Sequence, residues 1–221
     1  MMTTTELQRP GQLDDRIGGP DYPDLPTVVK CGRAAGRQPV VTGPGGCIFQ
    51  AGGDGLAWRV RQGVVRLDSI SPAGHPAFAS LAIAGDILGC EAPLLGAYAF
   101  TATALTHCEL TPWPEGEGAA NGESLLKSLA TAQRRAADIV ALRGGQAIDR
   151  VMGLVRLLAD RAGKVVLPAR RDIADITNLR FETISRVIKG LERSGVLAAV
   201  RIEGVRAARG YAVRFPGTAA P

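Results

Sequence analysis

The chain has 221 residues, of which 46% are hydrophobic and 21% charged, and its formal net charge is +5. This length is enough for two small domains, and the ordinary apolar content excludes disordered and fibrous proteins. The positive charge is concentrated in residues 145–221, which carry 14 Lys or Arg against 7 Asp or Glu, whereas residues 1–144 carry 12 against 14. A basic C-terminal part joined to a nearly neutral part indicates a nucleic-acid-binding module.

Residues 1–25 are polar and are interrupted by Gly and Pro, so we expect a mobile tail there. No apolar run in the chain approaches the length of a transmembrane helix, and its start lacks a basic-then-apolar signal pattern. We therefore expect a cytoplasmic protein with no membrane partner.

Short apolar or alternating runs fill residues 26–115, for example 56–60, 63–67, 78–83 and 100–105, with Gly, Pro and Asp between them. Short strands at nearly regular spacing, separated by turn residues, predict a β-sandwich or a jelly-roll barrel.

The four cysteines are separated by 15, 42 and 17 residues: Cys31, Cys47, Cys90 and Cys108. None of these pairs has the close spacing of zinc or iron–sulfur ligands, so we predict no metal and no cofactor. We interpret the cysteines as reduced thiols, with a redox-sensing thiol as the alternative.

A heptad seam follows in the helix predicted for residues 121–143. Its apolar residues recur at steps of four, three, four and three: Leu125, Leu129, Ala132, Ala136 and Ile139. A seam of this spacing usually packs against a second helix, so we interpret it as a dimerisation helix. The alternative is a single helix packed on its own barrel. Gly144 and Gly145 then end the helix.

Residues 145–216 predict a winged helix-turn-helix domain. Within residues 171–197, apolar residues recur at three- and four-residue steps in two short segments, which predicts two amphipathic helices. Asn178 lies between them, and Asn tolerates the left-handed conformation that ends a helix, so a turn is favoured over one continuous helix. Two alternating runs near residues 197–202 and 209–215 predict a hairpin, the wing.

The exposed face of the second of these helices is polar and basic: Arg180, Glu182, Thr183, Ser185, Arg186 and Lys189. An arginine there can bond bidentately to guanine, a carboxylate can accept from cytosine, and a small hydroxyl can approach thymine. Arg170 and Thr183 are candidate phosphate contacts, and Arg180 and Lys189 are further supporting residues.

Residues 182–186, Glu-Thr-Ile-Ser-Arg, and residues 190–196 resemble the recognition helix of the CRP/FNR superfamily of bacterial transcription regulators. Residues 85–89 and 104–110 resemble the cyclic-nucleotide-binding-type barrel of the same family. The resemblance implies an α+β protein with an N-terminal jelly-roll barrel, a long dimerisation helix and a C-terminal winged helix-turn-helix. It also implies a homodimer on double-stranded DNA, RNA polymerase as a partner, and no enzymatic activity.

The family pattern assigns base contacts to Glu182, Ser185 and Arg186. Phe181 stands where CRP has a second base-reading arginine, and Ser185 stands where CRP has glycine. Both differences resemble the FNR and FixK-like branch, which implies a pseudo-palindromic site with TTGA-type half-sites about one helical turn apart.

The family's nucleotide pocket needs a Glu for the ribose and an Arg-Ser pair for the cyclic phosphate, whereas this chain has Cys90, Tyr98 and Ala99 at those positions. A phosphate there would lose hydration and gain no opposite charge, so we expect no response to cAMP.

The alternatives to this regulator are a ligand-, haem- or redox-gated regulator of the same fold and a cupin-like metal enzyme. The closely spaced cysteine group of the cluster-bearing branch is absent from this sequence. The sequence contains two histidines, His75 and His107, which are weak support for haem and too few for a cupin site.

Overall fold

The computed structural model describes residues 38–113, 122–202 and 209–214, and for residues 122–126 it describes the backbone alone. The tail predicted for residues 1–25 and the tip of the predicted wing lie outside the described residues. No described helix combines the length and the apolar character needed to cross a membrane.

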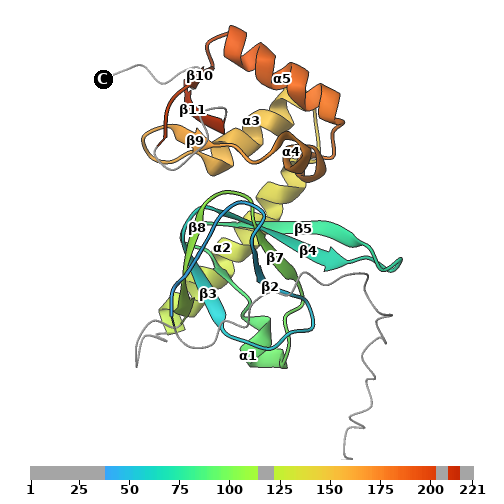
Figure 1. Ribbon diagram of the computed structural model, residues 1–221, viewed down its shortest axis with the longest axis vertical. Coiled ribbons are helices and arrows are strands. Elements are labelled where there is room, and N and C mark those ends of the chain that lie inside the picture. The colour runs from blue at the N-terminus through green and yellow to red at the C-terminus, as the bar shows by residue number, and fades with distance from the viewer. Residues whose placement is uncertain (1–37, 114–121, 203–208, 215–221) are drawn as a thin grey trace, which may run out of the picture.

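The N-terminal half is a sandwich of two four-stranded antiparallel sheets, which confirms the predicted barrel (Figure 1). In spatial order the first sheet contains β1 (Val40–Thr42), β8 (Cys108–Trp113), β3 (Ala57–Gln62) and β6 (Ile87–Leu88). The second contains β2 (Cys47–Phe49), β7 (Thr101–Ala104), β4 (Val64–Ile70) and β5 (Pro76–Ile83). A short helix, α1 (Glu91–Leu95), connects β6 to the strand β7.

The period-two pattern of the strands explains this sandwich. Ala102 and Ala104 of β7 are fully buried, whereas the residues that alternate with them are only half-buried. Cys108 and Leu110 of β8 are buried and flank the exposed Glu109. Alternate side chains of both sheets therefore point into one apolar interior.

The long helix α2 (Gly122–Ala141) runs along the barrel and leads into the C-terminal half (Figure 1). There α3 (Ala147–Leu158), α4 (Arg170–Thr177) and α5 (Phe181–Arg193) pack together beside a three-stranded sheet. That sheet contains β10 (Leu197–Ala199), β11 (Gly210–Val213) and β9 (Lys164–Val166), in this order. The helix-turn-helix and the two strands of the wing are therefore present as predicted.

The residues of the predicted heptad seam differ in their exposure to solvent. Leu129, Ala132 and Ala136 are exposed, and Leu129 is 57% exposed. Leu125 lies on the helix, but its side chain is outside the described residues. Ile139 is only 5% exposed because it packs into the core of its own chain, which leaves little of its side chain for a partner helix. The next residue, Val140, is 73% exposed and continues the exposed stripe instead.

Candidate nucleic-acid interface

The helix α5 is amphipathic and lies at the end of the molecule away from the barrel (Figure 1). Ile184, Ile188 and Leu191 are buried, because residues at steps of four and three share one helix face. The opposite face is exposed to solvent and carries Glu182, Arg186 and Lys189. Both charged residues predicted to read bases are thus available at an outer surface.

The turn before α5 has the predicted geometry. Asn178 is in the left-handed conformation, with φ of 51°, and it alone has a positive φ among the described residues other than glycine. Arg180 is the N-cap residue of α5, and its side chain is exposed. Glu182 lies in the first turn, where the positive end of the helix dipole favours a carboxylate.

Two residues with different predicted roles are in contact in the structure. Arg170, at the start of α4, donates from Nη1 to Oγ of Ser185 on α5 at 3.3 Å. Thr183 and Ser185 are both half-buried, unlike Glu182 and Arg186. Arg170 therefore orients the hydroxyl that we assign to base reading, a role that we did not predict. The two residues are 15 positions apart on different helices, so no local sequence pattern links them.

A partly buried hydrogen bond joins the wing to α5. Tyr211 of β11 donates its hydroxyl to Oε1 of Glu192, near the end of α5, at 2.8 Å. Burial and this carboxylate raise the pKa of Tyr211 to about 12, because both oppose the phenolate. The neutral phenol therefore holds the wing beside the recognition helix.

We predict that Tyr211→Phe lowers the free energy of unfolding by about 0.5–1.5 kcal/mol near neutral pH, because the partly buried hydrogen bond to Glu192 is lost. The contribution of the raised pKa is complete below about pH 10, where an unfolded tyrosine ionises, and is lost as the pH rises to about 12. Urea denaturation of both proteins from pH 8 to 11.5 measures this difference. A difference that grows with pH would contradict the assigned proton.

Tyr98, which stands at one of the predicted phosphate-binding positions, is packed inside the barrel. Tyr98 is 5% exposed, and its ring stacks on Phe49 with centroids 3.9 Å apart. Its hydroxyl donates to the carbonyl of Leu56 at 2.7 Å and accepts from Nε1 of Trp58 at 3.4 Å. These contacts satisfy the hydroxyl of Tyr98 inside the chain.

Two glycines make room for this tyrosine. A Cβ at Gly55 would collide with the hydroxyl of Tyr98, and a Cβ at Gly89 would lie 2.7 Å from its ring. Ala99 is exposed, and its N–H donates to Oε1 of Glu91 at 3.3 Å. Tyr98 and Ala99, at the predicted Arg-Ser positions, therefore contribute to packing and to a local turn contact.

Cys90 and Cys108 are free thiols, and Sγ of Cys47 donates to the carbonyl of Phe49 at 3.5 Å. Burial raises the pKa of Cys90, with a smaller contribution from Glu91, and burial also raises the pKa of Cys108. Both thiols are therefore held in the less reactive protonated form. Cys31 lies outside the described residues.

The two histidines are exposed in separate turns: His75 lies between β4 and β5, and His107 lies between β7 and β8. Nε2 of His107 is 3.7 Å from the carboxylate of Glu109. Within the described ranges, no three His, Cys, Asp or Glu side chains form a group that would hold a metal ion.

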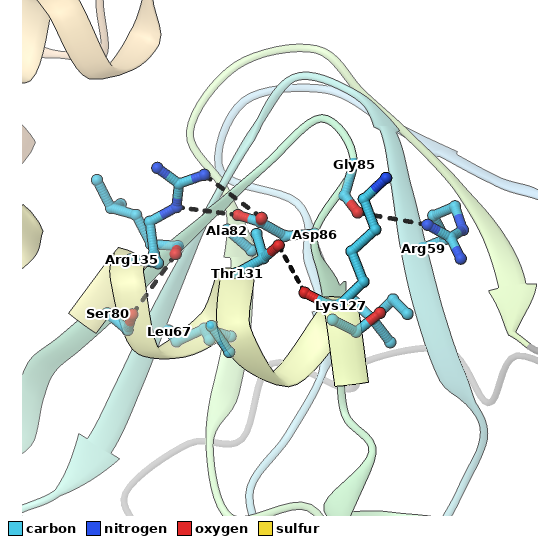
Figure 2. Close-up of a pocket in the computed structure, with 13 residues that line it drawn as sticks. Arg59, Leu67, Ser80, Ala82, Gly85, Asp86, Lys127, Thr131 and Arg135 are labelled. Carbon is cyan, nitrogen blue, oxygen red and sulfur yellow. Dashed lines mark hydrogen bonds and ion pairs between the residues drawn. The ribbon is translucent and has the colours of Figure 1, made fainter. Parts of the chain in front are cut away.

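A pocket of about 310 Å³ lies between the barrel and α2 (Figure 2). Arg59 and Ser80 line its barrel side, and Lys127 lines its α2 side. Arg135 of α2 pairs with Asp86 at 3.1 Å, and both side chains are at most 14% exposed. Asp86 also accepts from the N–H of Ile83 at 2.9 Å. The aspartate of the family's Gly-Asp string thus ties the barrel to α2.

Similar proteins support the same interpretation, although no protein-family model matches the chain. The nitrogen fixation regulation protein FixK of Bradyrhizobium diazoefficiens is 31% identical over 159 residues, which are 65% of this chain and 66% of FixK. FixK of Rhizobium meliloti is 29% identical over 146 residues, 64% of this chain and 68% of that protein. The matched region thus spans about two thirds of each FixK protein.

Two solved structures have a similar fold. FixK2 from Bradyrhizobium japonicum superposes with a TM-score of 0.59 at 26% identity, over 80% of this chain and 92% of FixK2. TTHB099, a CRP-family transcriptional regulator from Thermus thermophilus, gives a TM-score of 0.58 at 25% identity, over 79% and 91% of the two chains. The barrel, the long helix and the winged helix-turn-helix occur here in the same order, and the chain belongs to the FixK-like branch of the CRP/FNR superfamily of transcription regulators.

Proposed function

We propose that the protein regulates transcription by binding, as a homodimer, a pseudo-palindromic DNA site with TTGA-type half-sites. The observation that carries this proposal is the outer face of α5, where Glu182, Arg186 and Lys189 are exposed together on a helix fixed by a buried apolar face. A helix of this diameter and polarity fits the major groove of DNA.

The residues of α5 support the half-site assignment. The guanidinium of Arg186 can donate two hydrogen bonds to the O6 and N7 atoms of guanine, and the carboxylate of Glu182 can accept one from N4 of cytosine. Ser185, held by Arg170, supplies a small hydroxyl for the edge or methyl group of thymine. Phe181 is 50% exposed at the start of α5, where an apolar side chain makes no polar base contact.

The exposed stripe on α2 supports the homodimer. Leu129, Ala132, Ala136 and Val140 lie on one side of α2 without a partner from their own core. Small residues allow two helices to approach closely, and members of this family typically act as dimers on DNA. Two-fold symmetry then presents two copies of α5 to the two half-sites.

The filled barrel supports a regulator that does not respond to cAMP. Tyr98 occupies the interior and no arginine stands at its position, so an entering phosphate would meet neither space nor charge. We also propose that the protein acts in the cytoplasm, contacts RNA polymerase, needs no cofactor and has no enzymatic activity, because its relatives are transcription regulators.

A ligand-gated regulator of the same fold is the second candidate, and the pocket of Figure 2 favours it. Its lining comes from both the sensor barrel and the proposed dimerisation helix, so a ligand there would act on both.

Fluorescence anisotropy with a TTGA palindrome, a TGTGA palindrome and a scrambled duplex tests the proposal. We expect two protomers per duplex, preference for the TTGA site without any added ligand, and no change in affinity with millimolar cAMP. Equal affinity for the TTGA and scrambled duplexes would refute the proposed function. Binding that appears only after addition of cell metabolites would favour the ligand-gated candidate.

A further inference from the structure

A cluster of charged side chains joins the barrel to α4, the first helix of the helix-turn-helix. We call α4 and α5 together the reading head. Arg66 of β4 donates from Nη1 to Oδ2 of Asp175 at 3.0 Å, and the same nitrogen is 3.7 Å from Oδ1 of Asp172. Its Nε bonds to Asp68 of the same strand at 2.8 Å. The Arg66 side chain is only 15% exposed, so one half-buried guanidinium links the barrel to two carboxylates of α4.

A second arginine holds the other end of α4. Arg143 follows α2 and donates to the carbonyl oxygens of Asp175 and Ile176, both at 3.3 Å. These carbonyls belong to the last turn of α4, where backbone acceptors lack partners within the helix. The guanidinium of Arg143 is 5.1 Å from the centre of the Phe78 ring of β5, and that of Arg66 is 5.6 Å from the same centre.

The position of α4 determines that of the reading helix. Ile173 and Ile176 of α4 are buried in one core with Ile184 of α5, and Arg170 bonds to Ser185. A close-packed core does not deform continuously, so α4 and α5 move as one body. Whatever fixes α4 on the barrel therefore also fixes the direction of α5.

We propose that Arg66 and Arg143 are positioning residues for DNA recognition, which set the separation of the two α5 helices in the dimer. This inference rests on the proposed function, because it requires two reading heads on one palindrome. Each head can still bind its own half-site when the contact is lost. Binding of the second half-site is then weaker, because the α4 and α5 helices of the second protomer are no longer held at the correct spacing. Their effective concentration at that half-site is therefore lower.

A direct contact with DNA does not account for the role of Arg66. Its guanidinium is already bonded to Asp68 and Asp175, so no phosphate is needed to neutralise it. The salt dependence of DNA binding counts the phosphates that the protein neutralises. A positioning role therefore predicts a salt dependence that does not change when Arg66 is replaced.

The test compares Arg66→Gln, Asp175→Asn and the double variant on three duplexes: the palindrome, a palindrome lengthened by half a helical turn, and a single half-site. We expect the preference for the correct spacing to fall by about tenfold or more in each variant, while half-site affinity stays within about twofold. The double variant should be no worse than Arg66→Gln alone, because replacing Arg66 already removes its contact with Asp175.

Arg135→Gln is the matched control. Arg135 is 14% exposed and bonds to a barrel carboxylate, as Arg66 does, but it joins the barrel to α2 rather than to α4. If Arg135→Gln loses as much spacing preference as Arg66→Gln, the proposal is overturned. It is also overturned if the half-site affinity of the Arg66 and Asp175 variants falls as far as their palindrome affinity. Either result would indicate general destabilisation.

Small-angle scattering without DNA separates this inference from the proposed function. We expect a broader distribution of interdomain distances for Arg66→Gln than for the wild type and Arg135→Gln. An unchanged distribution would refute the positioning role even if the protein binds its palindrome. If the distribution of interdomain distances broadens in Arg66→Gln but the protein does not prefer TTGA sites, the proposed function and the role in DNA recognition are refuted. Only the structural role of Arg66 in the interdomain contact would then remain.

Discussion

Replacing Arg186 by alanine is expected to abolish the preference for a TTGA palindrome over a scrambled duplex and to leave the homodimer intact. Arg186 is exposed on the outer face of α5 and contributes nothing to the buried face. One bidentate contact with guanine discriminates by about 1–3 kcal/mol, so the two symmetric copies contribute about 2–6 kcal/mol. This corresponds to a loss of discrimination of roughly 30-fold to 20,000-fold.

Arg193→Ala is the control for charge. Arg193 is exposed in the last turn of the same helix, where its Nε donates to the carbonyl of Lys189. Loss of this charge should weaken binding to both duplexes equally, through the electrostatic attraction that every sequence shares. Mobility-shift titrations with both duplexes, together with sedimentation velocity, measure discrimination and dimerisation separately. Unchanged discrimination by Arg186→Ala would remove Arg186 from the base-reading residues.

The helix-turn-helix was predictable because its determinants are local. The spacing of Ile184, Ile188 and Leu191 defines one buried face of α5 without reference to the rest of the chain. The left-handed conformation of Asn178 follows from the short polar side chain of that residue and the apolar segments on either side. The apolar run at residues 100–105 predicted the strand β7 for the same reason.

The contacts that orient the reading head were not predictable from the sequence. Arg66 and Asp175 are 109 residues apart, and Arg66 occupies an alternating strand where a charged residue is expected to face solvent. The missing arginine at Tyr98 predicted the loss of an anion site, but not that the tyrosine ring would fill the barrel. Both results depend on the packing of segments that are distant in sequence.

The heptad pattern identified α2 but not all of its contacts. A residue at the edge of a seam can face either a partner helix or the core of its own chain, because both surfaces are apolar. Ile139 packs with Leu142 and Val151 in its own core, whereas Val140 remains exposed. Burial in the core of its own chain therefore removes Ile139 from the exposed stripe, which Val140 continues instead.

Ala136→Arg is expected to convert the protein to a monomer and to reduce its affinity for the palindrome to that of a single half-site. Ala136 is exposed near the middle of the stripe that contains Leu129 and Val140. An arginine there would separate two closely packed helices and place like charges opposite one another. The loss should reach about 100-fold or more in palindrome affinity, because the second half-site is no longer bound within one complex.

Ala130→Arg is the matched control, because it adds the same side chain at an exposed alanine on a different side of the same helix. It should keep the dimer and the palindrome affinity, which sedimentation equilibrium and anisotropy titration measure on the same samples. If both variants stay dimeric, two-fold contacts must lie on another surface, and the stripe on α2 cannot set the half-site spacing. If Ala136→Arg is monomeric but still prefers the palindrome to a half-site, recognition does not require the dimer that the proposed function assumes.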